Sequence, residues 1–576
     1  KSSNSSREQE PKRKMSFGKA VIGLLAASVA SLLDFSSAFE VVGGPSSPIN
    51  VTAHNYTDDE GALLQGFLSI PPNTGPIPGN GYPAVVILHD SSGVDAYEKQ
   101  RATMLAQQLG YVAFAADIFG VYAEMPTRDF RDPKYRAFMG QFNNNPAFFV
   151  QRIRAAVDFV KSLDIVDANN VAMIGYCFGG TGVIQYVYVG ETGATAGVVA
   201  FHPSLSPDTP GPVANITPPV LVITGGSDFL TSPMAMMTLE GNLNSAQATW
   251  ETVRYAGINH AWTNWFSPNY DERADARSWY SMKSFLGFQF GHEEYDTQPP
   301  LPASTNVDAV AYADKSDNGF ALQGYLSVPN DVSTENPVPA VIILPDMDGP
   351  TLYEKQRAAQ ISQEFGFIGF VADIYGYDVQ TSTAISSSDL DNQAQMYLEK
   401  KELYVSRIQA AVDFIKDHAL VDSDNIAVMG YSFGGTGSIY YTLIGDTSKV
   451  KSVASFHGGL LNGLPNAATT NSDVQIFIAS GADHDNINDI IELEEIYMAQ
   501  NAQYEISRYS NAQDGFTVWN GDNFDEYASS RSFDSMYMLL EEVFDVTKSP
   551  PFKTSASSNN EGMDTPTTSG VVSVLT

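Results

Sequence analysis

The amino-acid sequence predicts an α/β fold that occurs twice in tandem, each copy having a mostly parallel central sheet flanked by helices. Short, unbroken apolar runs bounded by turn residues indicate strands that are buried on both faces. Segments with apolar residues at helical spacing lie between these runs. The whole pattern then recurs after about 255 residues. A chain of 576 residues, 43% of them hydrophobic, is long enough for two globular cores.

The strands of the first copy are read from five apolar runs. These are PAVVILHD (83–90), VAFAADIF (112–119), VAMIGY (171–176), GVVAFHP (197–203) and PVLVITGG (219–226). Between the second and third runs, Val150, Ile153, Val157 and Val160 fall on one face of a helix. This alternation of strand and helix is typical of a parallel sheet.

The duplication is seen in matching segments that keep the same order in both halves. ALLQGFLSIP (62–71) matches FALQGYLSVP (320–329), YEKQRA occurs at 97 and again at 353, RIRAAVDFVK (152–161) matches RIQAAVDFIK (407–416), and GYCFGGTG (175–182) matches GYSFGGTG (430–437). A period of this length is a whole domain. We therefore expect domains over 48–295 and 307–550, a Pro-rich linker at 296–306 and a disordered tail at 551–576.

Charge and cysteine content exclude several classes of function. The chain has 66 acidic and 32 basic side chains, and its net charge of −34 repels nucleic acids and anionic membrane surfaces. We therefore expect no nucleic-acid partner. Cys177 is the single cysteine, so neither an intrachain disulfide nor a thiolate metal cluster can form.

Residues 1–39 have the features of a targeting segment. A basic stretch (11–19) precedes an apolar run (20–33) and the small residues at 36–38, which is the order found in secretory signal peptides. The alternative is an amphipathic or buried N-terminal helix. We expect entry into the secretory pathway and secretion, with no membrane span in the mature chain, because the run is too short to cross a bilayer. The tripeptide at 37–39 also resembles a cleavage motif of algae whose plastids are reached through the endoplasmic reticulum, so the plastid of a secondary-plastid alga is the alternative compartment.

Cys177 is the centre of the candidate chemistry. The run VAMIGY leads directly into this cysteine, Gly175 and Gly179 lie on either side of it, and a helix is expected to begin near Thr181. The G-x-nucleophile-x-G pattern forms a tight strand-to-helix turn that lifts a nucleophile above the sheet. We call this turn the elbow. A helix N-terminus lowers a thiol's pKa and offers backbone amides to an oxyanion. A buried structural cysteine beside packing glycines is the alternative.

Such a nucleophile needs a base and an acid to orient the base, and in this arrangement the order is nucleophile, acid, histidine. Asp228 lies in TGGSD after the strand VLVIT. His260 lies in YAGINHAW, between the strand TWETVRY and a helix beginning near Asp271. Taken singly, an aspartate after glycines is more often a turn residue and a loop histidine is more often structural. All three residues at these junctions, in this order, favour a catalytic triad.

The PAVVILHD run, the ADIFG segment, the cysteine turn, the Gly-x-x-Asp turn and the Gly-x-x-His loop together resemble the dienelactone hydrolase family. The resemblance covers roughly residues 50–293 and again 308–548. It implies an α/β-hydrolase fold and hydrolysis of a small-molecule ester or lactone, a reaction that needs no metal and no cofactor, and we expect neither. It also implies that Cys177 is the nucleophile, His260 the base and later the acid, and Asp228 the residue that orients His260.

The same resemblance assigns roles around the triad. Asp90 stands where the family has a glutamate that holds the resting thiol, and Ser91 and Phe178 would supply the amides of the oxyanion hole. Val121 and Asn264 occupy positions where family members that act on dienelactone have arginines for the substrate carboxylate. The resemblance therefore does not extend to recognition of a carboxylate.

The second copy departs from this pattern at the base. It keeps Ser432 at the elbow and Asp483 in the turn SGAD, but Asp514 stands where His260 would be. A serine without a base is a very weak nucleophile. We therefore expect the second domain to be inactive, with these three residues as remnants of a site, and to act by packing on the first domain.

Two other classes of function remain open. One is a non-catalytic binding protein with two degenerate domains, for which Asp514 is the evidence; the retention of His260 and Cys177 in the first copy favours the enzyme instead. The other is a thiol redox sensor at Cys177, which would lack a resolving cysteine.

Overall fold

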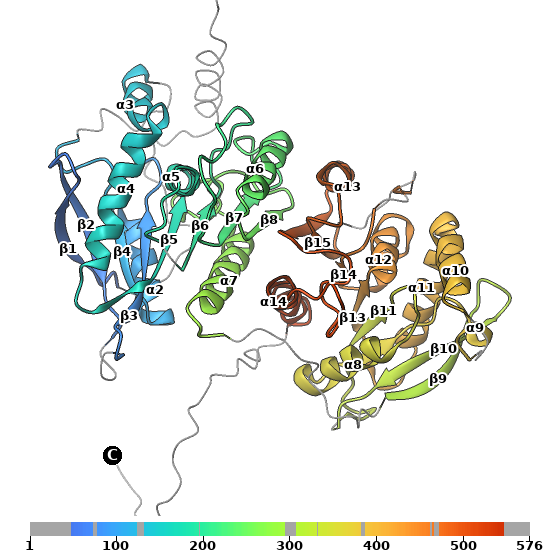
Figure 1. The fold of residues 1–576 in the computed structure, drawn as a ribbon. Coiled ribbons are helices and arrows are strands. Elements are labelled where there is room, and N and C mark those ends of the chain that lie inside the picture. The colour runs from blue at the N-terminus through green and yellow to red at the C-terminus, as the bar shows by residue number, and fades with distance from the viewer. Residues whose placement is uncertain are drawn as a thin grey trace, which may run out of the picture.

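The computed structural model describes residues 48–72, 78–123, 132–194, 196–293, 307–330, 332–381, 386–460, 463–465 and 472–545. The expected targeting segment (1–39), linker (296–306) and tail (551–576) lie outside them. None of the helices within these ranges is both long enough and apolar enough to cross a membrane. The described residues alternate strand and helix in two tandem domains, which confirms the predicted fold class and the duplication (Figure 1).

The first domain is drawn from blue to green in Figure 1. Its elements are β1 (Thr52–Thr57), β2 (Leu63–Ser69), β3 (Tyr82–Leu88), α2 (Ala96–Leu109), β4 (Val112–Ala116), α3 (Pro133–Asn143), α4 (Pro146–Lys161), β5 (Val166–Tyr176), α5 (Phe178–Tyr188), β6 (Gly197–Phe201), β7 (Val220–Gly225), α6 (Pro233–Ser245), β8 (Trp250–Tyr255) and α7 (Glu272–Gln289). The strand order is β1-β2-β4-β3-β5-β6-β7-β8, and the strands from β4 to β8 run parallel. β2 pairs antiparallel with both β1 and β4.

The second domain repeats this order, from yellow to red in Figure 1. Its elements are β9 (Val307–Asp314), β10 (Phe320–Ser327), β11 (Val338–Leu344), α8 (Leu352–Gln360), a π-helical turn (Ile361–Phe365), β12 (Ile368–Val371), α9 (Tyr377–Thr381), α10 (Ser387–Glu399), α11 (Lys401–Lys416), β13 (Val421–Tyr431), α12 (Phe433–Ile444), a 3₁₀ turn (Thr447–Lys449), β14 (Ser452–Phe456), β15 (Gln475–Gly481), α13 (Ile487–Ala499), β16 (Gln503–Tyr509) and α14 (Glu526–Val543). Its strands are arranged β9-β10-β12-β11-β13-β14-β15-β16.

Strand β3 illustrates why the apolar runs are unbroken. Its side chains alternate between the two faces of the sheet: Val85 and Ile87 pack with α2 and α7, whereas Val86 and Leu88 pack with α4 and α5. All four side chains are fully buried. Burying each contributes about 1.5–3 kcal/mol relative to leaving it exposed. Strand β3, which is covered on both faces, therefore carries no polar side chain in this stretch until it ends near the site.

Two element boundaries differ from the sequence-based expectation. β5 begins at Val166, before the run VAMIGY, because Val166 already pairs with Tyr82 of β3. α5 begins at Phe178 rather than near Thr181. Cys177 is therefore the residue immediately before the helix, and the unpaired amides of the first helical turn lie next to it.

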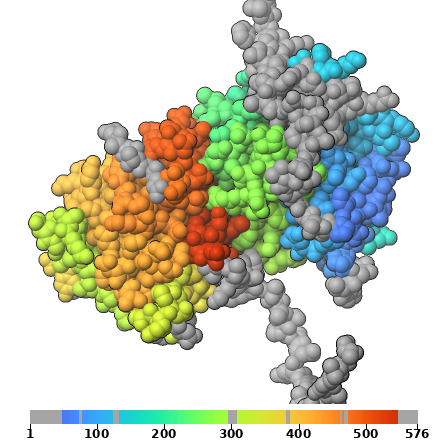
Figure 2. Space-filling model, turned by 180° about the vertical axis from the view of Figure 1, so that it is seen from behind, coloured from blue at the N-terminus to red at the C-terminus, as the bar shows by residue number. Residues whose placement is uncertain are grey.

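The two domains share one sheet, because β8 at the edge of the first pairs antiparallel with β16 at the edge of the second. Val253 lies opposite Ser507 at the centre of this pairing. Helices α7 and α14 contact one another beside it. Seen from behind, the green part of the first domain and the orange and red parts of the second meet over a broad face (Figure 2).

Candidate active site

Cys177 occupies a strained turn between β5 and α5. Its φ of 53° and ψ of −110° lie outside the regions that residues other than glycine ordinarily adopt. Gly179, two residues later, packs against the end of β3, where a Cβ atom would overlap the carbonyl oxygens of Leu88 and His89. Glycine permits this close approach. The approach places the elbow beside the segment that follows β3.

His260 and Asp228 meet Cys177 at the carboxyl edge of the sheet. His260 Nε2 lies 3.0 Å from Cys177 Sγ, and His260 Nδ1 lies 2.8 Å from Asp228 Oδ2. His260 and Asp228 are each only 3% exposed, whereas Cys177 is half-buried. The structure thus brings the three residues predicted as a triad into one hydrogen-bonded chain, with the sulfur at its more accessible end.

The surroundings of His260 favour its charged form. Burial by itself lowers the pKa of His260, but the charges of Asp228 and Cys177 and the hydrogen bonds to them outweigh burial and raise this pKa well above its usual range. These interactions therefore favour the imidazolium form of His260. An imidazolium beside a sulfur favours the thiolate, which is the reactive form of cysteine.

His202 is a site residue that the sequence analysis missed. Its Nδ1 accepts a hydrogen bond from the amide of Cys177 at 3.1 Å, and its ring packs edge-on against His260. Its Nε2 lies 2.8 Å from Oγ1 of Thr263, to which the Tyr97 hydroxyl also donates. Burial and the charge of His260 lower the pKa of His202 well below its usual range, so it stays neutral. A histidine follows the matching strand in both copies, and that recurrence is the signal that could have identified it.

Ser91 and Phe178 flank the elbow, where the sequence places the oxyanion hole. Phe178 is the first residue of α5, so its amide has no acceptor within the helix. Ser91 follows β3, whose end packs against the elbow, and its carbonyl accepts a hydrogen bond from the Tyr135 hydroxyl at 3.2 Å. That bond holds the carbonyl of Ser91 and restrains the backbone next to its amide.

Asp90 directly precedes Ser91, and its carboxylate binds groups other than the thiol of Cys177. Its carboxylate accepts hydrogen bonds from the amide of Ser92 at 2.7 Å and from Nδ2 of Asn264 at 2.9 Å. Among the described residues it forms no hydrogen bond with Cys177. Asn264, which stands at the position of a family arginine, thus binds a protein carboxylate in this structure.

Aromatic side chains lie against one flank of the elbow. Phe178 stacks on Phe149 with ring centroids 4.4 Å apart, and Phe119 and Phe142 also contact Phe178. Phe149 and Phe142 are buried. The ring at the start of α5 is therefore held by packing on α3 and α4.

Three larger apolar side chains are exposed close to the carboxyl edge of the sheet. Val121 and Tyr122 follow β4 and are 44% and 81% exposed, and Phe229, which follows Asp228 after β7, is 37% exposed. Ligands of parallel α/β sheets bind outside the carboxyl ends of the strands. Exposed apolar side chains at this edge suit an apolar ligand.

The second copy builds the same elbow around Ser432. Its φ is 49° and its ψ is −112°, and its amide lies 3.1 Å from Nδ1 of His457, the counterpart of His202. The Ser432 hydroxyl donates to Asp514 Oδ2 at 2.9 Å, and Asp514 Oδ1 lies 3.1 Å from His457 Nδ1. Where the first copy has an imidazole against the nucleophile, the second therefore has a carboxylate.

The position of the acid in the second copy corrects the sequence comparison. In the first copy the amide of Ser227 donates to the carbonyl of Ile258, three residues after the end of β8; in the second, the amide of Asp483 donates to the carbonyl of Ala512, three residues after the end of β16. His484 therefore occupies the position of Asp228, whereas Asp483 lies one residue earlier and is exposed. Aligning Asp483 with Asp228 in the sequence, instead of aligning the ends of β7 and β15, displaces the comparison by one residue.

The carboxylates of the second site have unusual surroundings. Burial and the charge of Glu354 raise the pKa of Asp346, the counterpart of Asp90, to about 7. Burial also acts to raise the pKa of Asp514, but its hydrogen bond and charge interaction with His457 lower it below its ordinary value. A carboxylate with a lowered pKa is a poor proton acceptor for Ser432. Within the described ranges, no group of three or more His, Cys, Asp or Glu side chains could hold a metal ion.

Comparison with known proteins places both domains in one family. The model of the dienelactone hydrolase family matches residues 64–290 and again 322–544. A putative carboxymethylenebutenolidase of Salmonella typhimurium is 26% identical over 275 residues, which cover 44% of this chain and 96% of that protein. A probable 2-oxo-3-(5-oxofuran-2-ylidene)propanoate lactonase of Bradyrhizobium sp is 27% identical over 155 residues, which cover 27% of this chain and 58% of that protein.

Among solved structures, a dienelactone hydrolase-like promiscuous phosphotriesterase from metagenomic libraries is 26% identical, with a TM-score of 0.37, and the match covers 42% of this chain and 99% of that one. The two family matches together span most of the chain and correspond to the two domains of the structure. The chain is therefore a dienelactone hydrolase-type hydrolase, a member of the dienelactone hydrolase family that carries its α/β-hydrolase domain in tandem duplicate.

Proposed function

We propose that the first domain hydrolyses carboxylic esters or lactones, with Cys177 as nucleophile, His260 as base and acid, and Asp228 as the residue that orients His260. The observation that carries this proposal is the hydrogen-bonded chain from Cys177 Sγ through the imidazole to Asp228, with distances of 3.0 and 2.8 Å. Nucleophile and base within hydrogen-bond reach, and the base held by a third group, are the geometric signature of nucleophilic catalysis.

The first half-reaction forms a thioester. The thiolate of Cys177 attacks the carbonyl carbon, and the electron pair of the C=O bond moves to its oxygen. The amides of Ser91 and Phe178 would donate hydrogen bonds to this oxyanion. When the oxyanion collapses, the bond to the alkoxide breaks and the alkoxide takes the proton from His260 Nε2. The alcohol leaves, or in a lactone stays attached to the acyl group.

The second half-reaction releases the acid. Neutral His260 accepts a proton from water at Nε2 while the water oxygen attacks the thioester carbonyl. Collapse of this second oxyanion breaks the C–S bond, and the thiolate again pairs with the imidazolium. Asp228 accepts a hydrogen bond from Nδ1 throughout, which keeps the proton-transferring nitrogen facing the sulfur.

The surroundings support a substrate that is apolar next to the scissile bond. The exposed side chains at the carboxyl edge, Val121, Tyr122 and Phe229, are apolar or aromatic. Asn264 is already bonded to Asp90. A substrate carboxylate near Asp90 would meet a like charge, so we propose that an uncharged ester or lactone is preferred.

Trapping of the acyl intermediate tests this proposal. The full chain is mixed with p-nitrophenyl butyrate, quenched in acid within one turnover and digested for mass spectrometry. One butyryl group is expected on the peptide that contains Cys177, and none in the His260→Ala variant, in which the thiol loses its imidazolium partner. An acyl group on another residue, or wild-type turnover by His260→Ala, would contradict the assignment. A butyrolactone with and without a carboxylate substituent then tests the charge preference, and faster turnover of the charged lactone would overturn it.

A further inference from the structure

The turn that carries Asp228 lies directly against the second domain. Gly226, the first residue after β7, faces Tyr504 of β16, and a Cβ atom at Gly226 would overlap the Tyr504 hydroxyl oxygen. The same Cβ would lie 3.3 Å from Oε1 of Glu494, which accepts a hydrogen bond from the Tyr504 hydroxyl at 2.9 Å. Two side chains of the second domain thus pack on the backbone two residues before the proposed catalytic acid.

Glu494 also holds this turn through an arginine of the first domain. Its two carboxylate oxygens accept hydrogen bonds from Nε of Arg254 at 2.8 and 3.0 Å. Nη1 of Arg254 in turn donates to Oγ1 of Thr224 at 3.2 Å, on the strand that leads into the turn, and to the carbonyl of Thr231 at 3.5 Å. Arg254 and Glu494 are buried. Removing either charge would leave the other buried without the opposite charge that it faces.

Thr231 closes the turn that begins at Asp228. Its amide donates to the carbonyl of Asp228 at 3.0 Å, and the amide of Leu230 donates to Oδ1 of Asp228 at 2.9 Å. The carboxylate oxygen that these bonds leave free is Oδ2, which binds His260. A continuous path of short polar contacts therefore runs from Glu494, through Arg254 and the turn, to the carboxylate that orients the imidazole.

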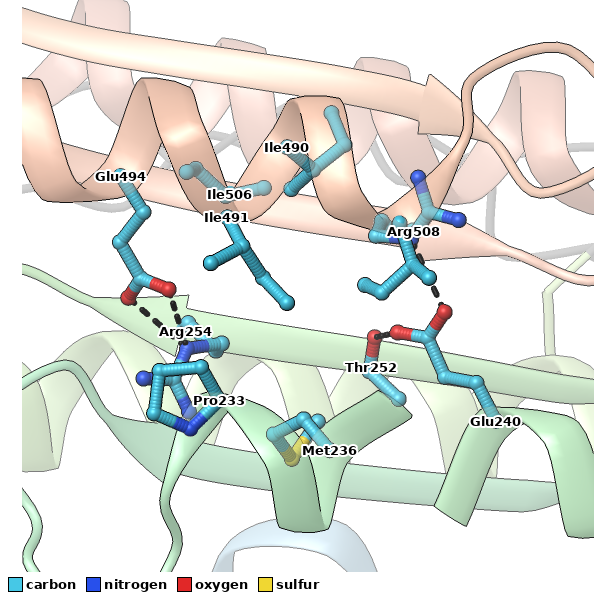
Figure 3. Close-up of a pocket in the computed structure, with 11 residues that line it drawn as sticks. Pro233, Met236, Glu240, Thr252, Arg254, Ile490, Ile491, Glu494, Ile506 and Arg508 are labelled. Carbon is cyan, nitrogen blue, oxygen red and sulfur yellow. Dashed lines mark hydrogen bonds and ion pairs between the residues drawn. The ribbon is translucent and has the colours of Figure 1, made fainter. Parts of the chain in front are cut away.

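The interface is approximately two-fold symmetric, so the opposite contact exists as well. Glu240 of α6 accepts from Nε of Arg508 at 3.1 Å, and Arg508 donates to the carbonyl of Asp485 in the turn of the second site (Figure 3). Figure 3 shows the two ion pairs on either side of a cavity of about 10 Å³. That space suffices for only about one water molecule, so the cavity is a packing feature rather than a ligand site.

We propose that Glu494 and Tyr504 of the second domain are positioning residues for the active site of the first. The proposal rests on the proposed function of the Cys177, His260 and Asp228 chain. Glu494 fixes Arg254 and Tyr504 fixes the backbone at Gly226, and together they set where Asp228 meets His260. The second domain thereby serves the reaction of the first, although its own elbow has a carboxylate where the first has an imidazole.

Alkylation of the single thiol tests the proposal without a substrate. The rate at which iodoacetamide alkylates Cys177 in the full chain is measured against pH, because this rate follows the thiolate and the chain has no other cysteine. In the Glu494→Ala variant Asp228 should hold the imidazolium less firmly. The pH of half-maximal alkylation should then rise by about one unit, and the rate measured one pH unit below the wild-type midpoint should fall about tenfold. Tyr504→Phe should also raise the pH of half-maximal alkylation, but by less.

Glu240→Ala is the matched control, because it breaks the symmetric ion pair at the same interface but releases the turn of the second site. It should lower the thermal unfolding temperature as Glu494→Ala does, yet leave the alkylation profile unchanged. If Glu240→Ala and Glu494→Ala gave the same dependence of alkylation rate on pH, whether shifted from wild type or not, the proposal would be overturned. If Glu494→Ala does not fold, Glu494→Gln and Tyr504→Phe carry the test, and wild-type profiles in both would refute it.

Asp228→Asn separates failure of this proposal from failure of the proposed function. It should raise the pH of half-maximal alkylation at least as far as Glu494→Ala, because it removes the carboxylate itself. A wild-type profile for Asp228→Asn would show that the triad assignment is wrong. A shifted profile for Asp228→Asn together with an unshifted one for Glu494→Ala would refute only the role of the second domain.

Discussion

The elbows of the two domains share their backbone geometry and supporting network but differ in three side chains, which are the nucleophile and the two polar residues next to it. The nucleophile positions have φ and ψ of 53° and −110° at Cys177 and 49° and −112° at Ser432. In both, the amide of the elbow lies 3.1 Å from a buried histidine, whose Nε2 lies 2.8 Å from a threonine hydroxyl. The strained turn and its supporting network therefore do not by themselves decide whether a domain can catalyse.

The difference between the sites is an exchange of an imidazole and a carboxylate. His260 contacts the nucleophile and Asp228 stands behind it in the first domain, whereas Asp514 contacts the nucleophile in the second and His484 occupies the rear position. An imidazolium next to sulfur favours a thiolate, but a carboxylate with a lowered pKa leaves the proton on the serine. The same scaffold thus supports opposite proton distributions.

The largest expected effect is the loss of turnover when the first nucleophile is removed. Cys177→Ala should reduce hydrolysis of p-nitrophenyl esters by about 10⁴-fold or more, because the covalent route is lost as it is in serine hydrolases. Ser432→Ala in the full chain should leave kcat and KM unchanged. Steady-state kinetics of the two variants measure the comparison directly. A drop in kcat for Ser432→Ala would mean that the second elbow is active.

A smaller effect is expected from reversing the exchange in the second domain. In the Cys177→Ala background, the paired substitutions His484→Asp and Asp514→His should raise esterase activity about 10- to 100-fold above that background, because serine, acid and histidine would then stand in the order of the first site.

The single substitution Asp514→His serves as the control for the exchange. It should give less activity than the pair, since the exposed Asp483 does not stand behind the new imidazole. Equal rates for the single and the paired variants would show that Asp483, rather than the residue at 484, acts as the acid.

The smallest effect concerns stability at Asp346. Burial and Glu354 raise the pKa of this carboxyl to about 7. The folded state therefore holds a proton that the unfolded state has lost, and stability falls as pH rises from the ordinary aspartate range through about 7. Asp346→Asn should raise the midpoint of thermal unfolding by a few degrees at pH 8 and change it little at pH 4.

Asp90→Asn is the first-domain counterpart of that change. It removes the carboxylate to which Asn264 donates at 2.9 Å, so it should not raise the unfolding midpoint at pH 8. Scanning calorimetry at the two pH values distinguishes the variants. A similar gain for both would show that the two aspartates have equivalent surroundings.

Local patterns were sufficient to predict the duplication, the parallel sheet and the three residues of the first site. Unbroken apolar runs fixed the strands, because a strand covered on both faces can carry few polar side chains. Cys177, Asp228 and His260 follow the ends of three parallel strands, and the ends of parallel strands lie at one edge. The order of these junctions along the chain therefore implied that their side chains would meet.

Other features depended on contacts that no local pattern encodes. That His484 rather than Asp483 matches Asp228 follows from the amide of Asp483, which donates to Ala512 as the amide of Ser227 donates to Ile258. The amino-acid sequence alone allows either residue to be aligned with Asp228. The contact of Glu494 and Tyr504 with the turn of Asp228 arises because β8 and β16 pair in one particular register, which brings residues about 270 positions apart into contact. The sequence by itself determined which groups are available for catalysis, and the tertiary structure decided what holds them, because register and packing depend on the whole sheet.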